Sequence, residues 1–408
     1  MQDYYDIIVG GGGLIGSIMA LSLAEYGFKV AKIDKLAATK QRSWDFDGRA
    51  YTLSLSTVKM LLTLKLWKEI SHRAEPVLDM KITDGISGYG VSPLHMHFDH
   101  REMIEGPLAY VIEDRFLRQA VLKRTKRFNT IKEFSGNGII AQQSFSGHCE
   151  VKLSNGDRIK TKLLIGADGR NSEVAAGAGL KRTTYSYEQI SLVCAVSHDK
   201  NHEGQAHQFF MPAGPLAILP LPGKISSVVW TVDKGLGERL GDTKDQLFVN
   251  ELKRCFGDFR GDIQLKGKRY AYPLSLSFVP EMVSNRIALV GDAAHAIHPI
   301  AGQGLNLGMR DVASLAEVIL SAHRIGEDIG SEAVLQRYNQ WRTIDRISLG
   351  GLTHFVNKLF SNDNFFLRSF RDIGLAVINR NTGLKTRLIE EASGLLGDTP
   401  ALMRGKGF

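Results

Sequence analysis

Cysteine is scarce in this sequence, and its three residues, Cys149, Cys194 and Cys255, lie far apart. None belongs to a Cys-x-x-Cys pair, which is the spacing that zinc fingers and many redox sites use. An odd and scattered set is typical of buried thiols in a reducing compartment. We therefore expect no disulfide framework and no metal site, since His295 and His298 also lack a third ligand at a suitable spacing.

Membrane-spanning segments are lacking as well. The run Ile7–Ala24 holds 18 residues without a charge, but it contains four successive glycines, and Asp3 and Asp6 precede it. Glycines would break a spanning helix, and a signal peptide would begin with positive charge. The other uncharged run, Gln205–Gly223, contains four prolines. We expect a cytoplasmic protein, and peripheral contact with the inner membrane stays open.

Basic residues exceed acidic ones by 51 to 43, which gives a net charge of +8. Such an excess suits an anionic membrane surface or a nucleic acid. However, no basic run is interleaved with aromatic residues, and no helix-turn-helix or zinc-finger spacing is present, so we expect no nucleic-acid partner. The length of 408 residues exceeds the size at which a single core stops growing, so two domains are expected.

The first of three informative glycine-bearing segments is Gly11-x-Gly13-x-x-Gly16. It follows an apolar run and opens a stretch with helical apolar spacing, so the context is strand, tight turn and helix. Gly11 permits the turn, Gly13 lets a pyrophosphate approach the backbone, and Gly16 permits close packing. The next expected strand ends at Asp34, whose carboxylate can accept hydrogen bonds from a ribose. This pattern predicts a dinucleotide site but does not separate NAD from FAD.

The second and third segments follow short apolar runs of the buried-strand type. They are Gly166-Ala-Asp168-Gly and Gly291-Asp292, the latter continuing to His298-Pro299-Ile-Ala-Gly302-Gln303-Gly304. Ligands of open α/β sheets bind at the carboxyl ends of strands, so we expect the three segments to meet there. Asp168 and Asp292 either contact the ligand or only form their turns.

Together these segments resemble the FAD-dependent aromatic hydroxylases, the class typified by p-hydroxybenzoate hydroxylase. Four runs are similar to the ubiquinone-biosynthesis branch of that class, and they cover residues 47–54, 110–117, 214–223 and 286–308. The resemblance extends from the amino terminus to about Arg346. The family pattern often continues Asp-Gly-x-x-Ser-x-Val-Arg after the second aspartate, but this chain has Ala175 in the last position. A nicotinamide or pyrophosphate role for that arginine therefore cannot be transferred.

The resemblance implies roles for several residues. Asp168 lies near the pyrophosphate and Asp292 binds the ribityl chain, while Arg49 and, with weaker support, Arg115 reach the pyrophosphate or the isoalloxazine. It implies a monooxygenase that hydroxylates the ring of a polyprenylated phenol in ubiquinone biosynthesis. FAD would be reduced by transiently bound NAD(P)H and would react with O2 through a C4a-hydroperoxide. A prenyl reductase, a halogenase and a non-catalytic FAD-binding scaffold within a quinone-biosynthesis complex stay open as alternatives.

Reduced flavin carries negative charge at its N1/C2 carbonyl edge, and a helix amino terminus can stabilise that charge. A helix is predicted directly after Gly302-Gln303-Gly304, so we expect the segment from Gly302 to Asn306 to be this stabilising turn. A plain helix start is the alternative. His298 and Pro299 are the candidate catalytic residues, because His298 could orient the phenol or move its proton. The alternative for His298 is a hydrogen bond to the backbone beside the flavin.

The expected fold is mixed α/β, with a Rossmann-like FAD-binding domain, an interleaved antiparallel substrate sheet and C-terminal helices. Residues 1–73, 101–182 and 273–345 are assigned to the FAD-binding domain, 74–100 and 183–272 to the substrate-binding sheet domain, and 346–408 to the C-terminal helical region. Runs Ser191–Val196, Leu216–Leu219 and Ser226–Val232 are expected strands of that sheet. The segment Leu349–Leu388 mixes aromatic with basic residues and is expected to form amphipathic helices. They either pack on the protein or contact a membrane.

Overall fold

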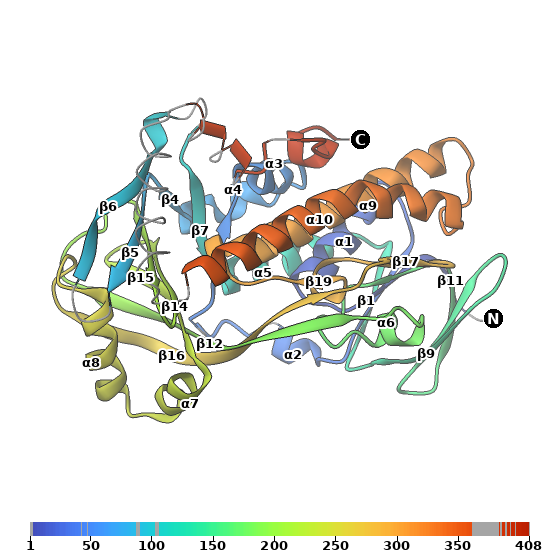
Figure 1. The fold of residues 1–408 in the computed structure, drawn as a ribbon. Helices are drawn as coiled ribbons and strands as arrows, with labels where there is room; N and C mark the ends of the chain where they lie inside the picture. The colour runs from blue at the N-terminus through green and yellow to red at the C-terminus, as the bar shows by residue number, and fades with distance from the viewer. Residues whose placement is uncertain are drawn as a thin grey trace.

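The structure is a computed structural model that describes residues 3–41, 43–46, 48–86, 90–102, 106–360 and parts of 383–407. It has two halves, each built on an eight-stranded sheet (Figure 1). One sheet is mostly parallel and carries helices, and the other is mostly antiparallel. The predicted fold class, a Rossmann-like domain with an interleaved antiparallel sheet, is confirmed.

The parallel sheet has the strand order β17-β18-β11-β1-β2-β8, and β10 and β9 extend it from β11. The central strands β1 and β18 contain continuous apolar runs because both faces are covered there, and Ile7, Ile8 and Val9 are fully buried. The strands are β1 (Tyr4–Gly10), β2 (Val30–Asp34), β8 (Ile131–Ser135), β9 (Ile139–Ser144), β10 (Cys149–Leu153), β11 (Arg158–Gly166), β17 (Val283–Ser284) and β18 (Ile287–Leu289).

Helices and a small sheet complete this half of the molecule. The small sheet has the order β3-β7-β4 and consists of β3 (Ala50–Leu53), β7 (Ala109–Glu113) and β4 (Glu75–Val77). The helices are α1 (Leu14–Ala24), α2 (Ala38–Gln41), α3 (Leu55–Thr63), α4 (Trp67–Ile70), α5 (Asp114–Thr125), α6 (Glu173–Gly177), α9 (Gln303–Arg324) and α10 (Glu332–Phe360). Short 3-10 turns lie at η1 (Ser71–Arg73), η2 (His100–Glu102), η3 (Gly291–Ala293), η4 (Ile300–Gly302) and η5 (Ala401–Arg404).

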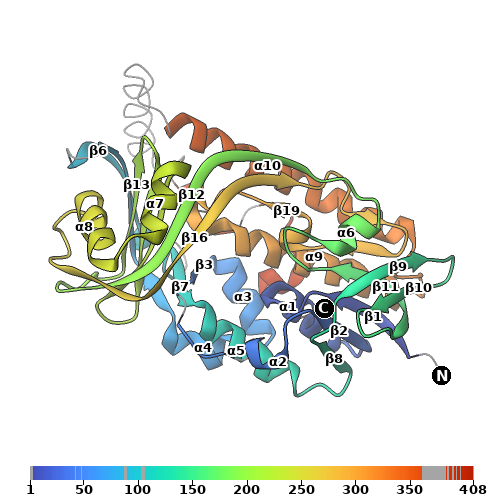
Figure 2. The same ribbon diagram turned by 90° about the horizontal axis from the view of Figure 1, so that it is seen from below.

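The second sheet has the order β19-β16-β12-β15-β14-β13-β5-β6. Its strands are β5 (Asp79–Ile86), β6 (Gly90–Asp99), β12 (Thr183–His198), β13 (Gln205–Met211), β14 (Gly214–Leu221), β15 (Ile225–Asp233), β16 (Ile263–Phe278) and β19 (His295–Ala296). The three strands expected in this region lie within β12, β14 and β15, so that prediction is confirmed. Figure 2 shows β12 and β16 running side by side from one half of the molecule to the other.

Each face of the antiparallel sheet packs against a different partner. The outer face packs on α7 (Lys234–Asp242) and α8 (Asp245–Phe256), in a core that contains Phe209, Trp230 and Phe248. The inner face packs against the half of the molecule that contains the parallel sheet. There Phe210 lies in one cluster with Val111 and Ile300. Adjacent residues Phe209 and Phe210 therefore belong to different cores, as strand alternation requires.

The C-terminal region is described in part. α10 includes the first portion of the segment predicted to be helical, while residues 361–382, with Phe365, Phe366 and Phe370, lie outside the described residues. None of the described helices combines the length and the apolar character needed to cross a bilayer.

Candidate active site

The three glycine-bearing segments meet at one edge of the parallel sheet. Strands β18, β11, β1 and β2 are neighbours in that order and run parallel. Gly10 is paired with Gly166 on one side and with Ile33 on the other, and Gly166 is paired with Leu289. The residues that follow these four strand ends therefore lie along one edge, as the sequence predicts.

The glycines of the first segment are held by close backbone packing. A Cβ at Gly11 would lie 2.3 Å from the carbonyl oxygen of Ala167, in the second segment. A Cβ at Gly16 would lie 1.9 Å from the carbonyl oxygen of Gly11. In contrast, a Cβ at Gly13 would have no protein atom within 4 Å. Gly11 and Gly16 are therefore required by the fold, while Gly13 leaves space for a ligand at the start of α1.

Asp34 lies at the end of β2, directly beside this turn. Its Oδ2 accepts a hydrogen bond from the Gly12 N–H at 2.7 Å, and its Oδ1 accepts one from the Leu36 N–H at 2.7 Å. The carboxylate is fixed in orientation by these bonds and is still partly exposed. A carboxylate oxygen has two lone pairs, so each can accept a further bond from a ribose hydroxyl.

A cleft of about 780 Å³ begins at this turn and extends to the antiparallel sheet. Three of the predicted cofactor residues, Gly13, Asp34 and Arg49, line it. Its other lining residues include Lys40, Arg118 and Lys268, so cations are available along its length. Sequence reasoning missed these three because they lie outside the glycine-bearing segments. The cleft is well within the range of size that cofactor sites have.

Arg49 and Arg115 differ in their surroundings. Arg49 lies 3.6 Å from the Asp114 carboxylate with its side chain 43% exposed, so it can reach a ligand in the cleft. Arg115 does not line the cleft, because its Nε donates to Glu113 at 2.6 Å and its guanidinium stacks on Phe46. Arg118, one helical turn further along α5, takes the position on the cleft instead. A cofactor role for Arg115 stays a prediction.

The second and third segments touch through charged side chains. The Asp168 carboxylate accepts hydrogen bonds from the Ser172 hydroxyl and from the N–H groups of Glu173 and Val174, so it orders the start of α6. Asp292 is half exposed and accepts a 3.4 Å bond from Arg170 Nε. Asp292 is therefore the aspartate of this pair whose carboxylate is more available to a ligand.

Cations at this edge come from positions that the sequence analysis did not select. Arg182 donates to the carbonyl oxygens of Asp292 and Ala293. Ala175 occupies the place of the family's arginine and is buried in the core. Arg170 and Arg182 therefore supply positive charge near the second and third segments.

The turn before α9 has the backbone geometry that glycine favours. Gly302 has φ +63°, and a Cβ there would lie 3.0 Å from Thr52 Oγ1. A Cβ at Gly304 would meet no protein atom within 4 Å, and Gln303 lies between these two glycines at the first position of α9. The helix predicted after Gly304 is confirmed, and it begins slightly earlier, at Gln303, so its amino terminus lies within this turn.

Asn306 joins the turn to β3 and α3. Its amide nitrogen donates to the Thr52 carbonyl oxygen at 2.9 Å, and its amide oxygen accepts from Ser54 N and Thr57 Oγ1 at 3.0 and 2.8 Å. The side chain is buried and occupied by these bonds. Asn306 therefore fixes the position of the turn, and direct contact of its side chain with a cofactor stays a prediction.

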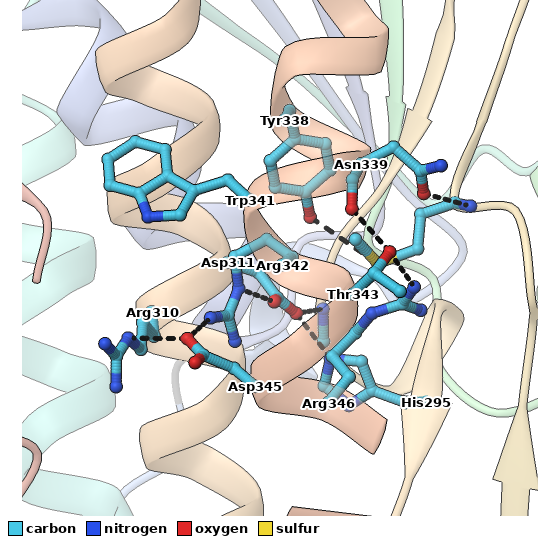
Figure 3. Close-up of polar contacts among 12 residues, drawn as sticks. His295, Arg310, Asp311, Tyr338, Asn339, Trp341, Arg342, Thr343, Asp345 and Arg346 are labelled. Atoms are coloured by element: carbon cyan, nitrogen blue, oxygen red, sulfur yellow. Dashed lines mark hydrogen bonds and ion pairs between the residues drawn. The ribbon is translucent and has the colours of Figure 1, made fainter. Parts of the chain in front are cut away.

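A buried charge network lies behind the third segment (Figure 3). Asp311 of α9 accepts hydrogen bonds from the Gly291 N–H at 2.9 Å and from Arg342 Nε at 2.8 Å, and it lies 2.6 Å from His295 Nε2. Asp311 and Arg342 have fully buried side chains. Desolvation alone would raise the pKa of the Asp311 carboxyl, but its interactions with His295 and Arg342 outweigh this and hold the pKa far below the ordinary value.

This network fixes the turn at Gly291, which has φ +61°, to α9 and α10. Tyr338 adds a second link, because its hydroxyl donates to the Leu289 carbonyl oxygen at 2.8 Å. Asp311, Arg342 and Tyr338 were not selected from the sequence. Within the described ranges, no three His, Cys, Asp or Glu side chains come together as a metal ion would need.

His298 is completely buried, and neither of its ring nitrogens has a hydrogen-bond partner among the described residues. Burial lowers the pKa of His298 to about 4, so the ring is neutral at pH 7. Tyr187 lies edge-on to it with ring centroids 5.1 Å apart, and the Tyr187 hydroxyl is 3.1 Å from His354 Nδ1. The alternative role in which His298 bonds to backbone is wrong for this structure, since both nitrogens are unpartnered. Pro299 follows it and is partly buried.

The residues present suit a flavin dinucleotide. The open position at Gly13 and the free N–H groups of the first turn of α1 would hold the pyrophosphate. Asp34 would bind the adenosine ribose, and Asp292 would bind the ribityl chain. The amino terminus of α9 would face the isoalloxazine ring.

Comparison with known proteins decides the family. The model of the FAD binding domain family matches residues 4–344. The chain is 38% identical to ubiquinone hydroxylase UbiL of Rhodospirillum rubrum, over 98% of this chain and 92% of that protein. It belongs to the FAD-dependent hydroxylases of ubiquinone biosynthesis. FAD is therefore the cofactor of this monooxygenase, and NAD(P)H is the reductant typical of its family.

A second relative agrees with this membership, and a solved structure shares the fold. The hydroxylase is 31% identical to 3-demethoxyubiquinol 3-hydroxylase of Escherichia coli, over 96% of this chain and 98% of that protein. Its fold is similar to that of p-nitrophenol 4-monooxygenase PnpA from Pseudomonas putida, with a TM-score of 0.80 and 17% identity over 97% of this chain and 99% of that chain. Of the activities that the sequence leaves open, membership of this family supports hydroxylation.

Proposed function

We propose that this enzyme hydroxylates the aromatic ring of a polyprenylated phenol, using O2 and NAD(P)H. Two relatives are named ubiquinone hydroxylase and 3-demethoxyubiquinol 3-hydroxylase, and these names support this substrate class. When bound and reduced, FAD supplies the chemistry that activates oxygen. The protein has to orient the ring, exclude water and control one proton.

Exclusion of water is supported by the apolar cluster between the two halves. Phe210 of the antiparallel sheet and Val111 of β7 pack in this cluster with Ile300, which follows Pro299. A phenol ring held against the turn at Pro299 would therefore lie next to apolar side chains on more than one side. In such a site, hydrogen bonds to the substrate are stronger than they would be in water.

The observation that carries the proposal is the unpartnered His298. A neutral imidazole has one donor and one acceptor nitrogen, and leaving both unbonded in the protein interior costs free energy. A phenol hydroxyl bound beside Pro299 would donate to the acceptor nitrogen, which orients the ring and draws proton density from its oxygen. We propose His298 as the catalytic residue that binds the substrate hydroxyl, with Pro299 forming the wall beside it.

Tyr187 contacts the ring of His298 and is itself within hydrogen-bond distance of His354. Residues 186–190 form an irregular step in the pairing of β12 with β16, and Glu188 within it has φ +52°. Bulges of this kind redirect side chains near active sites. Burial raises the pKa of Tyr187 to about 12, so its hydroxyl stays protonated and can donate to His354. We propose Tyr187 as a positioning residue that holds the ring plane of His298.

The test uses the purified, FAD-loaded enzyme with a short-chain prenyl phenol, and it measures NADH oxidation and hydroxylated product separately. We expect the phenol to stimulate NADH oxidation and one oxygen atom from ¹⁸O2 to enter the ring. His298→Gln should lower the rate of product formation by about 100-fold or more while NADH oxidation continues. His72→Gln, at an exposed histidine, is the matched control.

The role of His298 and the substrate class can be rejected independently of each other. A wild-type rate of product formation by His298→Gln would reject the role of His298 but leave the reaction in place. Absence of oxygen incorporation with every prenyl phenol tested would reject the substrate class.

We also propose that α10 contacts the anionic inner membrane, where a polyprenylated substrate resides. Ile344, Ile347 and Phe355 are 74%, 56% and 62% exposed and lie on one face of the helix. The net charge of +8 would favour an anionic surface. Flotation with phosphatidylglycerol vesicles tests this contact. Replacing all three residues with serine should reduce binding to the vesicles. Leu247→Ser, at an exposed apolar position on α8, should not reduce it.

A further inference from the structure

A second cavity, of about 330 Å³, lies on the outer face of the antiparallel sheet. Its walls come from alternate residues of two adjacent strands and from the segment after α8. The lining residues are Lys81, Thr83, Gln205, His207, Phe209, Phe259 and Arg260. Ala206 and Phe210, which alternate with these positions on β13, belong to the core on the other face of the sheet. The sheet therefore separates this cavity from the cleft that suits FAD.

The cavity carries two cations, Arg260 and Lys81, and neither is in direct contact with a carboxylate within the described ranges; Glu203 acts on Arg260 only from a distance. Arg260 is 5% exposed and donates to the carbonyl oxygens of Asn201 and His202 at 2.9 and 3.2 Å, not to an acidic side chain. Lys81 forms no ion pair with another described residue. Asp79, two residues before Lys81 on β5, is instead bonded to His97 at 2.6 Å.

Two buried polar atoms of the lining residues also have no partner in the described part of the chain. They are Nε of Arg260 and the hydroxyl oxygen of Thr83. Burial, together with the charges of Arg260 and Lys81, lowers the pKa of His207 to about 3, so His207 adds no charge at pH 7. The guanidinium of Arg260 also lies 3.3 Å from Gln205 Oε1 and 3.4 Å from His207 Nε2, both neutral partners. A buried guanidinium with no carboxylate in direct contact is costly, and a bound anion would relieve that cost.

We propose that this cavity binds the carboxylate or phosphate group of a small ligand between Lys81 and Arg260. The planar guanidinium and the flexible ammonium are both suited to oxyanions. The rings of Phe209 and Phe259 would contact a flat apolar part of the ligand. This site is distinct from the FAD cleft and does not depend on the proposed reaction.

The proposal is tested on the FAD-loaded full-length enzyme by thermal unfolding and calorimetry. The probes are inorganic phosphate and sodium benzoate, each compared with sodium chloride at equal ionic strength. We expect at least one probe to raise the unfolding temperature above that in chloride, as a ligand of the native state does. Lys81→Gln should weaken its binding about tenfold, since a hydrogen bond to a charged group is lost. Lys266→Gln, an exposed lysine on β16 of the same sheet, should leave it unchanged.

The two probes distinguish the ligand types. Tighter binding of benzoate would assign the site to an aromatic carboxylate, and tighter binding of phosphate would assign it to a phosphate group. Thr83→Val, which removes only the hydroxyl, is a second variant that keeps the packing volume and should also weaken binding. Equal unfolding temperatures in phosphate, benzoate and chloride would overturn the proposal. Equal affinities of Lys81→Gln and Lys266→Gln would overturn it as well.

Discussion

The carboxylate of Asp311 lies 2.6 Å from Nε2 of His295, in the buried contact between α9 and the third glycine-bearing segment. The same carboxylate accepts from the Gly291 N–H and from Arg342 Nε (Figure 3). One buried charge therefore connects the turn expected to bind the ribityl chain with α9 and α10. Its removal should affect both stability and cofactor binding.

Asp311→Asn removes the fully buried negative charge and leaves Arg342 with only the partly exposed Asp345 as a counterion. We expect the free energy of unfolding to fall by about 3–5 kcal/mol, the usual effect of breaking a buried pair. FAD affinity should also decrease, which fluorescence titration of the apoprotein measures. Asp262→Asn is the control, because Asp262 pairs with Lys253 at a position that is 80% exposed. An unchanged unfolding midpoint for Asp311→Asn would contradict the structural role of this network.

Gly13→Ala and Gly16→Ala should have different consequences. The new methyl group at position 16 would collide with the Gly11 carbonyl oxygen, so we expect a misfolded or strongly destabilised protein. The methyl group at position 13 meets no protein atom, so the chain should fold normally but bind FAD weakly. Unfolding midpoints and the bound flavin content of the purified proteins measure the two effects. Full flavin content in Gly13→Ala would contradict the proposed approach of the pyrophosphate.

Gly302→Val should abolish flavin binding or reduction. A β-branched residue is strained at φ +63°, and its Cβ would press on Thr52. Gly147→Ala is the control, because it lies in the turn between β9 and β10, its methyl group would enter open space and its φ is not positive. Stopped-flow absorbance of flavin reduction by NADH gives the comparison. A Gly302→Val protein that binds and reduces FAD normally would reject the role of this turn.

His298 should make stability depend on pH. Its pKa is about 4 in the folded state and 6.5 as the ordinary value, so the unfolded state binds the proton first as the pH falls. The folded state therefore loses stability between pH 6.5 and about pH 4, by up to about 3 kcal/mol. Denaturation of the wild type and of His298→Gln at several pH values isolates this contribution, and the difference between them should change over that window. A difference independent of pH would show that His298 is not buried as described.

Much of the half that contains the parallel sheet could be predicted from sequence, because parallel strands end at a common edge. Gly11, Gly166 and Gly291 each follow a short apolar run, and that order was sufficient to place their turns together. The helix after Gly302 was predictable from its apolar spacing in the same way.

The supporting side chains were not predictable, because their roles depend on packing between distant elements. Asp311 and Arg342 look like ordinary helix-surface charges in the sequence, and only the contact of α9 with α10 makes them a buried pair. The sequence also could not choose between Arg115 and Arg118. The rotation of α5 against the cleft decides that choice.

The most direct test of the central claim is a crystal structure of the enzyme with FAD bound. The account predicts the pyrophosphate at Gly13 and the amino terminus of α1, the ribityl chain at Asp292 and the isoalloxazine ring at the turn from Gly302 to Asn306. An isoalloxazine ring far from Gly302 and His298, with the dinucleotide outside the cleft that Gly13 and Asp34 line, would contradict it.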